Sequence, residues 1–401
     1  MTTFMKLLYP DMKKGESRRL VFFVSEDWYF CSHRLGLALE AQRNGYKVFL
    51  VCNTTGQKYT KMIENAGIEL IPISINRSDT GIFTNINTLL TLYRIFKRIG
   101  PNIVHNVAQK PIILGTIVSK MLGVRSVINA FGGLGYVFSS ETLKARVLRC
   151  ILRLVYKGLL TKANVRLIVQ NETDYFYFSD EIGCEAKRIY LIKGAGVDTE
   201  KYNYSPATNN GRGNITVVML ARLLRDKGVY EFCNAAKMTK AVQPDIEFLI
   251  AGDIDPKNPN SLTPHQVTEL VATCGVNYVG QIEDVATLLI DSDIAILPSY
   301  REGMPKSLLE AAAIGRPIIT TDVPGCRDVV CHGINGYLVP AYDSNELASR
   351  VIELANNPQL RIKMGKFSRE LAEKEFCHNK INKTVLAIYN NTFDRDHDGK
   401  A

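Results

Sequence analysis

The stretch LPSYREGMPKSLLEAAAIGRPIITTDVPGCRDVVC, Leu297–Cys331, decides the fold. The apolar run at 293–297 just before it is typical of a buried parallel strand reaching its carboxyl end. A Gly-Met-Pro turn follows, and then a helix that we expect Ser307 to cap and Gly315 to end. A second apolar strand is expected at 318–321. This order of strand, turn, helix and strand predicts one unit of a doubly wound α/β sheet.

Two carboxylates frame this unit. Glu302 lies in the turn after the strand, and Glu310 lies eight residues later, in the helix. Ligands of such sheets bind beyond the carboxyl ends of the strands, where helix N-termini attract anions. A phosphate at Ser307 and Leu308 would therefore lie between the two carboxylates, with a ribose diol at Glu310. The alternative is that both are ordinary solvated carboxylates, as most single Glu residues are.

Two motifs together resemble a known family. The run EGMPKSLLEA begins at Glu302, and the run ARLLRDKG occupies residues 221–228. Both are similar to motifs of retaining glycosyltransferase family 4, whose members use nucleotide sugars, and the resemblance extends over roughly residues 20–390. It implies an α/β GT-B fold, with two doubly wound Rossmann-like domains facing each other across a cleft. The second domain is then expected to hold the donor and the first to hold the acceptor.

Two series of alternating strands and helices support two domains. The first series has strand-like runs at 20–25, 47–52, 68–73, 102–106, 126–130, 165–170 and 188–192. The second has them at 214–220, 246–251, 277–279, 293–297, 317–321 and 336–339. Helical stretches include 32–44, 84–99, 344–356, 358–376 and 380–389. A polar linker at 203–213 suggests a first domain over 1–205, a second over 206–378, and a C-terminal helix in 379–401 that crosses back, followed by a polar tail.

Composition separates the two halves. The net charge is +9, but residues 1–205 hold 28 Lys and Arg against 16 Asp and Glu, so the basic excess belongs to the first half. Such asymmetry favours an anionic partner, either a membrane surface or a polyanion. The nine cysteines show no metal-site spacing. No apolar run is long enough to cross a membrane and the N-terminus lacks a signal-peptide core, so we expect a cytoplasmic protein.

The donor site is expected on the second domain. Arg222 and Lys227 lie five residues apart and can grip a diphosphate from both sides, stabilising it as it leaves. Taken alone, they could equally be surface cations. The resemblance places Gly252, Gln281 and Ile282 beside the nucleobase. The resemblance and the spacing together give the remaining donor positions as Glu302, Gly303, Met304, Pro305, Lys306, Ser307, Leu308 and Glu310. Met304 and Lys306 are candidates for sugar selection.

The acceptor site is expected on the first domain, in the run SEDWYFCSHR at 25–34. Family relatives with a similar run act on polyprenyl-diphosphate-linked sugars. We interpret this run as an acceptor loop, with His33 and Arg34 near an acceptor phosphate. Its predicted contact residues are Asp27, Trp28, Tyr29, His33 and Arg34. The alternative is a set of aromatic side chains that pack beneath a loop.

A glycine-rich run, NAFGGLGY at 129–136, follows a first-domain strand. Gly132 and Gly133 allow the backbone to approach a ligand closely. Many family members carry a His here that touches the donor sugar, so this departure leaves the sugar's outer hydroxyls without an assigned partner. His105 ends another strand and is interpreted as facing the cleft, with a structural His as the alternative.

The segment Glu141–Lys162 is a basic amphipathic helix. It carries six cations against one acid, and its apolar residues recur at three- and four-residue spacing. The apolar positions are Leu148, Ile151, Leu152, Val155 and Leu159. Such a helix lies well on an anionic bilayer, although a solvated basic face over a core helix has the same pattern.

These observations and the resemblance predict a retaining glycosyltransferase. It would move a hexose or N-acetylhexosamine from a UDP-linked nucleotide donor to a polyprenyl-diphosphate-linked saccharide. Glu302, Arg222 and Lys227 are the candidate catalytic residues; no metal, no cofactor and no nucleic acid are expected. The enzyme would lie at the inner membrane face and serve surface polysaccharide assembly. The alternatives are a nucleotide-sugar 2-epimerase of the same fold and a non-enzymatic polyanion-binding protein.

Overall fold

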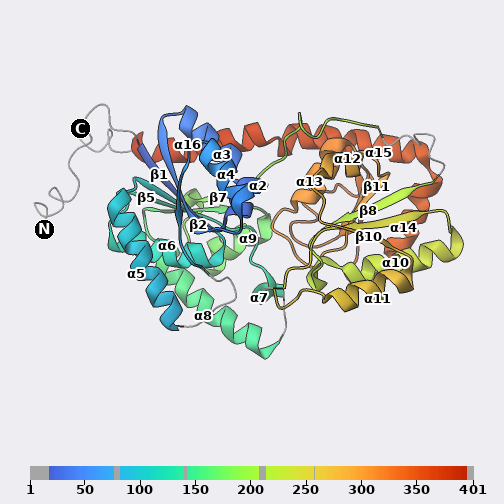
Figure 1. Cartoon of the computed structure of the whole chain (residues 1–401), viewed down its shortest axis with the longest axis horizontal. Helices are drawn as coiled ribbons and strands as arrows, with labels where there is room; N and C mark the ends of the chain where they lie inside the picture. Colours follow the sequence, from blue (N-terminus) through green and yellow to red (C-terminus); the bar gives the residue numbers. More distant parts are fainter. Residues whose placement is uncertain (1–17, 76–81, 140–141, 207–213, 257, 395–401) are drawn as a thin grey trace, which may run out of the picture.

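Two α/β domains lie side by side, and the C-terminal helices run across both (Figure 1). The structure, a computed structural model, describes residues 18–75, 82–139, 142–206, 214–256 and 258–394. Most of the predicted linker, the polar tail from residue 395, the first seventeen residues and Glu141 lie outside the described residues.

The first sheet has seven parallel strands in the order β3-β2-β1-β4-β5-β6-β7. These are β1 (Arg18–Glu26), β2 (Tyr46–Asn53), β3 (Glu69–Pro72), β4 (Ile103–Val107), β5 (Ser126–Ala130), β6 (Val165–Val169) and β7 (Ile189–Leu191). The helices between them are α2 (Asp27–His33), α3 (Leu35–Arg43), α4 (Gln57–Asn65), α5 (Ile82–Ile99), α6 (Gln109–Met121), α7 (Tyr136–Ser139), α8 (Leu143–Leu160) and α9 (Glu172–Phe176). The predicted strands of this series are confirmed: the central strands β4 and β5 are buried along their whole length, and the edge strands β3 and β7 are only partly buried.

The second sheet has six parallel strands in the order β10-β9-β8-β11-β12-β13. These are β8 (Thr216–Leu220), β9 (Glu247–Ala251), β10 (Asn277–Gly280), β11 (Ile294–Leu297), β12 (Ile318–Thr321) and β13 (Gly336–Val339). Its helices are α10 (Val229–Val242), α11 (Pro264–Cys274), α12 (Val285–Ile290), α13 (Lys306–Ile314), α14 (Ser344–Asn356) and α15 (Pro358–Leu371). The two parallel sheets confirm the predicted doubly wound class.

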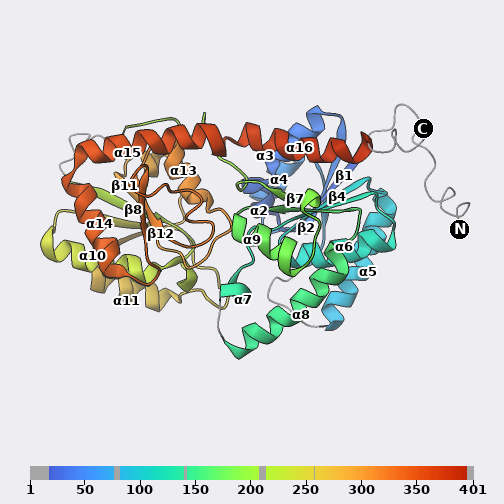
Figure 2. The ribbon, with the colours of Figure 1, turned by 180° about the vertical axis from the view of Figure 1, so that it is seen from behind.

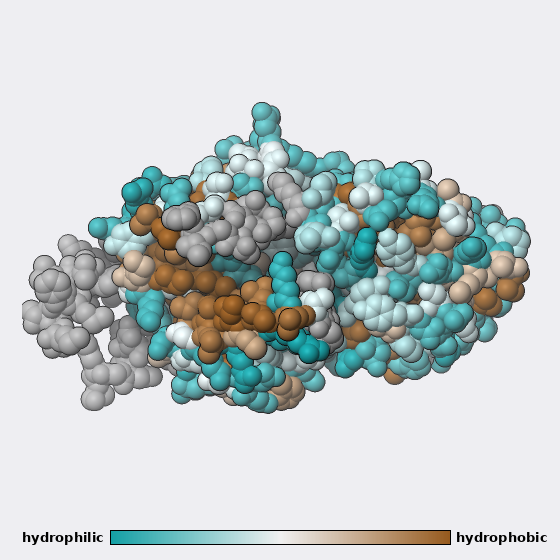
Figure 3. Space-filling model, turned by 90° about the horizontal axis from the view of Figure 1, so that it is seen from below, coloured by the Kyte–Doolittle hydropathy of each residue, from teal (hydrophilic) through white to brown (hydrophobic). Residues whose placement is uncertain are grey.

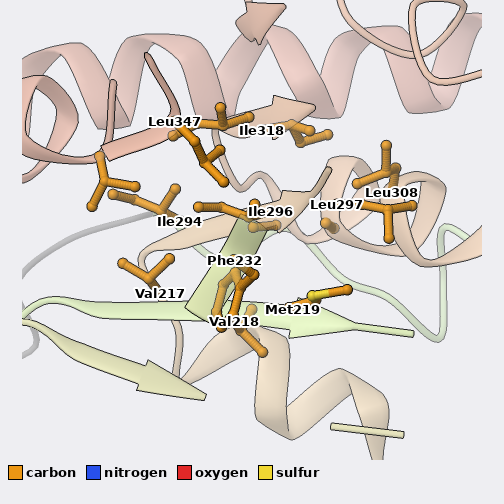
Figure 4. Close-up of a cluster of buried hydrophobic side chains, with 14 of the residues drawn as sticks. Val217, Val218, Met219, Phe232, Ile294, Ile296, Leu297, Leu308, Ile318 and Leu347 are labelled. Atoms are coloured by element: carbon orange, nitrogen blue, oxygen red, sulfur yellow. The ribbon is translucent and has the colours of Figure 1, made fainter. Parts of the chain in front are cut away.

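The core of the second domain surrounds β8 and β11, the central strands of its sheet. Figure 4 shows Val218, Ile296 and Phe232 pointing into one cluster, with Leu308 from α13 and Leu347 from α14 at its edges. All five are at most 2% exposed. This close packing fixes the carboxyl end of β11 relative to α13, and therefore the loop between them.

Both sheets reverse their strand order at their centres. In the first sheet, β2 and β3 extend it on one side of β1, and β5, β6 and β7 extend it on the other side of β4. In the second sheet, β9 and β10 lie beyond β8, and β12 and β13 lie beyond β11. In open α/β sheets this switch point leaves a crevice beyond the strand ends, where ligands bind. The loops after β1, β8 and β11 are therefore placed to form a site.

The last helix, α16 (His378–Asp394), returns to the first domain (Figure 2). It packs with the strands β1 and β4 through Ile381, Val385 and Tyr389. Tyr46 from β2 donates a hydrogen bond from its hydroxyl to Asn390 Oδ1 at 2.8 Å. The C-terminal segment thus clasps the two domains together.

The local predictions for residues 25–44 are wrong in two respects. The acceptor loop expected at 25–34 is not a loop, because β1 extends to Glu26 and the helix α2 begins at Asp27. The helix expected at 32–44 is interrupted at Arg34, whose φ of −130° is not helical. The side chains of this run therefore point in the directions that a helix imposes, and only some of them can face the cleft.

Candidate active site

Glu302 lies in the loop between β11 and α13, at the edge of the second domain. Its carboxylate accepts a hydrogen bond from Ser299 Oγ at 2.8 Å and forms an ion pair with Lys227 Nζ. The two charged side chains are only 12% and 17% exposed. The backbone N–H of Glu302 donates to the carbonyl of Pro324 at 3.1 Å. The carboxylate is thus oriented, paired with a cation and largely shielded from solvent.

Lys227 lies beside this loop because two backbone segments, residues 226–228 and residues 298–300, pack tightly against each other. Tyr300 N–H donates to the carbonyl oxygen of Asp226 at 2.9 Å, and Ser299 Oγ lies 2.9 Å from the same oxygen. Gly228 has a left-handed φ of 75°, and a Cβ at this position would lie 2.1 Å from the Pro298 carbonyl oxygen. Only glycine can occupy that position, which explains the glycine that ends the run ARLLRDKG.

Arg222 is held differently from Lys227. Its Nη1 donates to Asp255 Oδ2 at 2.6 Å, so its guanidinium is paired with a carboxylate of the loop after β9. Asp255 is itself fixed, because its N–H donates to Ser261 Oγ at 3.0 Å. Positive charge at the site therefore comes from side chains that carboxylates already orient.

Glu310 lies on α13 and is 7% exposed, so it is not a surface carboxylate. Its Oε1 accepts a hydrogen bond from the Tyr202 hydroxyl at 2.8 Å and lies 3.2 Å from Lys306 Nζ. Burial and the nearby carboxylate raise the pKa of Tyr202 well above its ordinary value, so this tyrosine stays a donor. The hydrogen bond from Tyr202 thus holds the Glu310 carboxylate in one orientation.

The helix α13 begins without the predicted cap. Its N-cap is Pro305 and no side chain caps it, so Ser307 lies inside the first turn. The reason is the Gly-Met-Pro turn, since proline holds the extended backbone that precedes a helix. The N–H groups of Leu308 and Leu309 donate to the carbonyl of Pro305 at 3.1 and 3.3 Å, which leaves those of Lys306 and Ser307 to meet an anion. Gly315 ends the helix with φ 90°, as expected.

Met304 is not placed to select a sugar. It is 8% exposed, and a Cβ added at Gly194 would lie 2.9 Å from its Cγ. The side chain packs inward against the segment that joins the domains. Lys306 is half-buried at the start of α13.

The residues predicted to border the nucleobase lie in the loops after β9 and β10. Gly252 has φ 145°, and a Cβ there would lie 1.9 Å from the Ala221 carbonyl oxygen. Its own carbonyl accepts a hydrogen bond from the Tyr278 hydroxyl at 3.0 Å. Gln281 is exposed and Ile282 half-buried just beyond β10. Because residue 252 is a glycine, the backbone of Ala221 and Arg222 can pack directly against this region.

Asp27 does not face an acceptor. It is fully buried, and its oxygens accept from Thr55 N at 2.9 Å, Thr55 Oγ1 at 2.5 Å and Trp28 N at 2.8 Å. Trp28 Nε1 in turn donates to Glu26 Oε2 at 2.6 Å. The carboxylates of Glu26 and Asp27 thus hold the chain around α2 in place. This corrects the prediction that Asp27 contacts an acceptor.

Tyr29 and His33 form the part of α2 that faces the second domain. Their rings stack with centroids 4.2 Å apart and an interplanar angle of 5°. His33 Nδ1 lies 2.6 Å from Ser32 Oγ. Burial, followed by the positive charges of Lys306, Arg34 and Arg222, lowers the pKa of His33 to about 3. The imidazole is therefore neutral at physiological pH and lies near cations of the donor domain.

Arg34 and His105 lie inside the first domain, contrary to prediction. Arg34 is 5% exposed, and His105 is fully buried. The His105 ring stacks on Phe22, and its Nδ1 lies 2.5 Å from the Tyr389 hydroxyl of α16. Burial lowers the pKa of His105 well below its ordinary value. The helix α16 covers this end of β4, so neither side chain reaches an acceptor.

Gly132 and Gly133 approach the other domain rather than open space. A Cβ on Gly133 would lie 2.8 Å from Gly303 N, and one on Gly132 would lie 3.4 Å from the Tyr29 hydroxyl. The glycine-rich run thus brings Tyr29 close to the loop of Glu302. The two halves of the predicted site meet here.

Three polar partners were missed in the sequence: Tyr202, Asp255 and Ser299. Asp255 follows the glycine turn at Gly252, and Ser299 lies three residues before Glu302, which were the available signals. Tyr202 adjoins the linker, and nothing in its surroundings distinguishes it. Within the described residues, no three His, Cys, Asp or Glu side chains gather where they could hold a metal.

The helix α8 has two apolar faces. Ala145, Tyr156 and Leu160 are buried against the first domain. On the opposite side it exposes a second set of large apolar side chains: Leu143, Val147, Leu148, Ile151 and Leu154. Figure 3 shows a continuous hydrophobic band on this side of the first domain. None of the helices in the described ranges is long and apolar enough to span a membrane.

Comparison with protein families assigns both halves of the chain. Residues 19–171 match the family described as glycosyl transferase 4-like, and residues 201–371 match the family described as glycosyl transferases group 1. The two matches follow the two sheets.

Curated relatives extend over most of the chain. The N,N'-diacetylbacillosaminyl-diphospho-undecaprenol alpha-1,3-N-acetylgalactosaminyltransferase of Campylobacter jejuni is 26% identical over 342 residues, which are 83% of this chain and 88% of that protein. The UDP-Gal:alpha-D-GlcNAc-diphosphoundecaprenol alpha-1,3-galactosyltransferase of Escherichia coli is 26% identical over 79% of this chain and 82% of that protein.

Solved structures share the fold. A glycosyltransferase from Rickettsia africae superimposes with a TM-score of 0.75 at 18% identity, covering 94% of this chain and 99% of that one. HepE of Anabaena, solved in complex with UDP and glucose, superimposes with a TM-score of 0.74 at 16% identity, covering 94% of this chain and all of that one.

Proposed function

The chain belongs to the glycosyltransferases of the GT-B fold with 4-like and group 1 domains, and we propose that it moves a sugar from UDP to a polyprenyl-diphosphate-linked saccharide with retention. One observation carries this proposal. Glu302 of the second domain, paired with Lys227, lies in the loop that Gly132 and Gly133 of the first domain approach. A donor diphosphate and an acceptor hydroxyl can therefore meet at this loop.

The donor diphosphate would lie between Arg222 and Lys227, over the first turn of α13. Its negative charge would draw Lys227 from Glu302 and Arg222 from Asp255, since each cation already has a polar partner that it can exchange. The N–H groups of Lys306 and Ser307, at the start of α13, would add helix-terminus stabilisation. The proposal needs neither a metal nor a cofactor, because these groups supply the positive charge.

The nucleoside would extend from the diphosphate toward Gly252, Gln281 and Ile282. Glu310 would bind the ribose diol, oriented by the Tyr202 hydroxyl. A buried, oriented carboxylate is suited to two hydroxyls, because it offers several lone pairs in fixed directions.

The chemical step would break the bond between the sugar C1 and the diphosphate and form one to the acceptor oxygen. The leaving phosphate oxygen would take the acceptor proton on the same face, which retains the configuration. Glu302 would stabilise positive charge developing on the sugar, while Lys227 stabilises the leaving group. Removing one such group typically costs 10²–10³ in turnover.

The acceptor proposal follows from the first domain. Tyr29 and His33 present a flat aromatic surface toward Lys306, a suitable wall for a sugar ring. Both relatives described above act on diphospho-undecaprenol-linked saccharides. A lipid-linked acceptor of this class also fits the exposed apolar face of α8, flanked by Lys144, Arg146 and Lys157.

The membrane contact is part of the same proposal. We infer that α8 rests on the anionic inner face of the cell membrane, with its apolar band among the acyl chains and its cations at the headgroups. This peripheral position would place the first domain beside a lipid-anchored acceptor.

A two-stage experiment tests the function. Thermal unfolding with a panel of nucleotide sugars identifies the donor, since a tight binder raises the melting temperature. That donor is then incubated with a short-chain polyprenyl-diphosphate saccharide, and the anomeric protons of the product are read by NMR. Transfer with an α-anomeric product supports the proposal. Epimerised nucleotide sugar, formed without acceptor, would instead identify a 2-epimerase.

A further inference from the structure

An ion pair joins the two domains immediately beside Glu302. Arg301 Nη2 in the β11–α13 loop donates to Asp174 Oδ1 in α9 of the first domain, at 2.8 Å. The Asp174 side chain is fully buried and that of Arg301 is 16% exposed. Figure 2 shows α9 at the edge of the first domain that faces the second. The residue next to Glu302 is therefore held by the opposite domain.

Asn171 strengthens this contact from the first domain. Its Oδ1 caps α9 by accepting from Asp174 N at 2.8 Å. Its Nδ2 lies 3.2 Å from Asp174 Oδ2 and 3.3 Å from the carbonyl oxygen of Gly303. One amide thus orients the buried carboxylate and also contacts the backbone on the other side of Glu302.

The backbones of the two domains are in direct contact at the same place. A Cβ on Gly303 would lie 2.5 Å from the carbonyl of Gly132 and 2.6 Å from Gln170 Oε1. No side chain larger than hydrogen fits there while the domains are closed. The first domain therefore contacts Arg301 through an ion pair and Gly303 through backbone packing.

Glu302 itself has its polar contacts within its own domain, to Lys227, Ser299 and Pro324. Its position consequently depends on two supports: its own domain through these bonds, and the first domain through its two neighbours. Separation of the domains would remove the second support only.

We propose that Asp174, Asn171 and Arg301 form a cross-domain latch that positions Glu302 for the chemical step when the domains close. The latch rests on the proposed role of Glu302 in sugar transfer. It couples the chemistry to closure, so that the loop is fully ordered only when the acceptor domain is in place. In an open enzyme, the donor would still bind through the second domain.

The energetics favour positioning over simple adhesion. Burial raises the pKa of Asp174 despite the opposing effect of Arg301, so desolvation of the carboxylate largely offsets the attraction between the charges. Buried ion pairs of this kind contribute little net stability yet impose strict geometry. Opening the latch would therefore cost little net free energy, while its geometry still defines one closed arrangement.

The test compares Asp174→Asn and Arg301→Lys with a matched control. Both variants remove the ion-pair geometry with little change in size. The control is Lys58→Met, which breaks an exposed cross-domain ion pair to Glu283 away from the loop. We expect kcat for sugar transfer to fall at least tenfold in both latch variants, with KM and calorimetric affinity for the donor within twofold of wild type. The control should keep both values, and the melting temperatures show that each variant folds.

A double-variant comparison separates positioning from adhesion. In a Glu302→Gln background, Asp174→Asn should cause little further loss, because the latch acts through Glu302. An equal loss in both backgrounds, or wild-type kcat in Asp174→Asn and Arg301→Lys, would overturn the latch. If Glu302→Gln lowers transfer but the latch variants do not, the latch alone fails. If Glu302→Gln itself transfers at the wild-type rate, the proposed function of Glu302 fails and the latch with it.

Discussion

Lys227 Nζ binds the carboxylate of Glu302 although 75 residues separate them in the chain. The pair joins the loop after β8 to the loop after β11, the two central strands of the second sheet. Without a donor, each charge neutralises the other inside a largely shielded site. A bound diphosphate would compete for the lysine and leave the carboxylate to face the sugar.

Changing Lys227 to Ala should weaken donor binding and lower kcat/KM by about 2–4 kcal/mol of transition-state stabilisation, because the leaving diphosphate loses its cation. Steady-state kinetics with saturating acceptor measure this loss. Lys237→Ala, an exposed lysine on α10 of the same domain, is the control and should behave as wild type. Unchanged kcat/KM in Lys227→Ala would remove this lysine from the donor site.

Glu310 should bind the ribose of the donor. Glu310→Gln is expected to raise KM for the donor with little effect on kcat, since the contact is made equally in the ground and transition states. Tyr202→Phe, which keeps the carboxylate but removes the bond that orients it, should raise KM less. Wild type should also lose its advantage over Glu310→Gln when a 2′-deoxyribose donor is used. Full additivity of the two changes would contradict the assignment.

His33 should stay neutral across the physiological range. Burial and the cations Lys306, Arg34 and Arg222 lower its pKa to about 3, while the hydrogen bond to the Tyr29 backbone opposes this shift. Because the folded state disfavours the proton, its contribution to stability is present above the unfolded value of about 6.5 and is lost as pH falls toward 3. Long-range ¹H–¹⁵N NMR should show no titration of this ring between pH 5 and 8.

Lys306→Met supplies the matching test of His33. Removing the cation across the cleft should raise the pKa of His33, whereas Lys237→Met should leave it unchanged. A ring that titrates near 6.5 in the wild-type enzyme would show that His33 is solvated and does not face the donor domain.

The helix α8 should hold the enzyme on anionic membranes. Leu143 and Leu154 are 78% and 72% exposed, and each would bury apolar surface worth about 1.5–3 kcal/mol on insertion. Replacing both with Asp should release the protein from vesicles that contain phosphatidylglycerol, as measured by sedimentation. Activity on a long-chain polyprenyl acceptor should fall, while activity on a short soluble analogue persists.

The control for α8 is Val242→Asp on α10, which is similarly exposed but lies on the second domain. It should still sediment with the vesicles. A double variant that also sediments would mean that α8 is only a solvated helix over the core.

The strands were predictable because parallel strands buried on both faces leave continuous apolar runs in the sequence. The strands β5 and β13 begin and end where their runs do. The helix α2 was not predictable: its polar and aromatic residues suggested a loop, but hydrogen bonds from Thr55 to the buried carboxylate of Asp27 stabilise a helix instead. His105 was misplaced for a related reason, since a helix 284 residues further along the chain covers it.

The sequence by itself determined the doubly wound class, the two-domain order and the motif that carries Glu302 and Glu310, because local periodicity and short-range turns encode these features. Only the tertiary structure decided which polar side chains face the cleft and which are buried. Asp27, Arg34 and His105 became internal, whereas Asp174, Tyr202 and Asp255 became partners of site residues. The physical reason is that the position of a charged side chain depends on the residues that shield it from water and pair with it. These residues lie in segments far away along the chain.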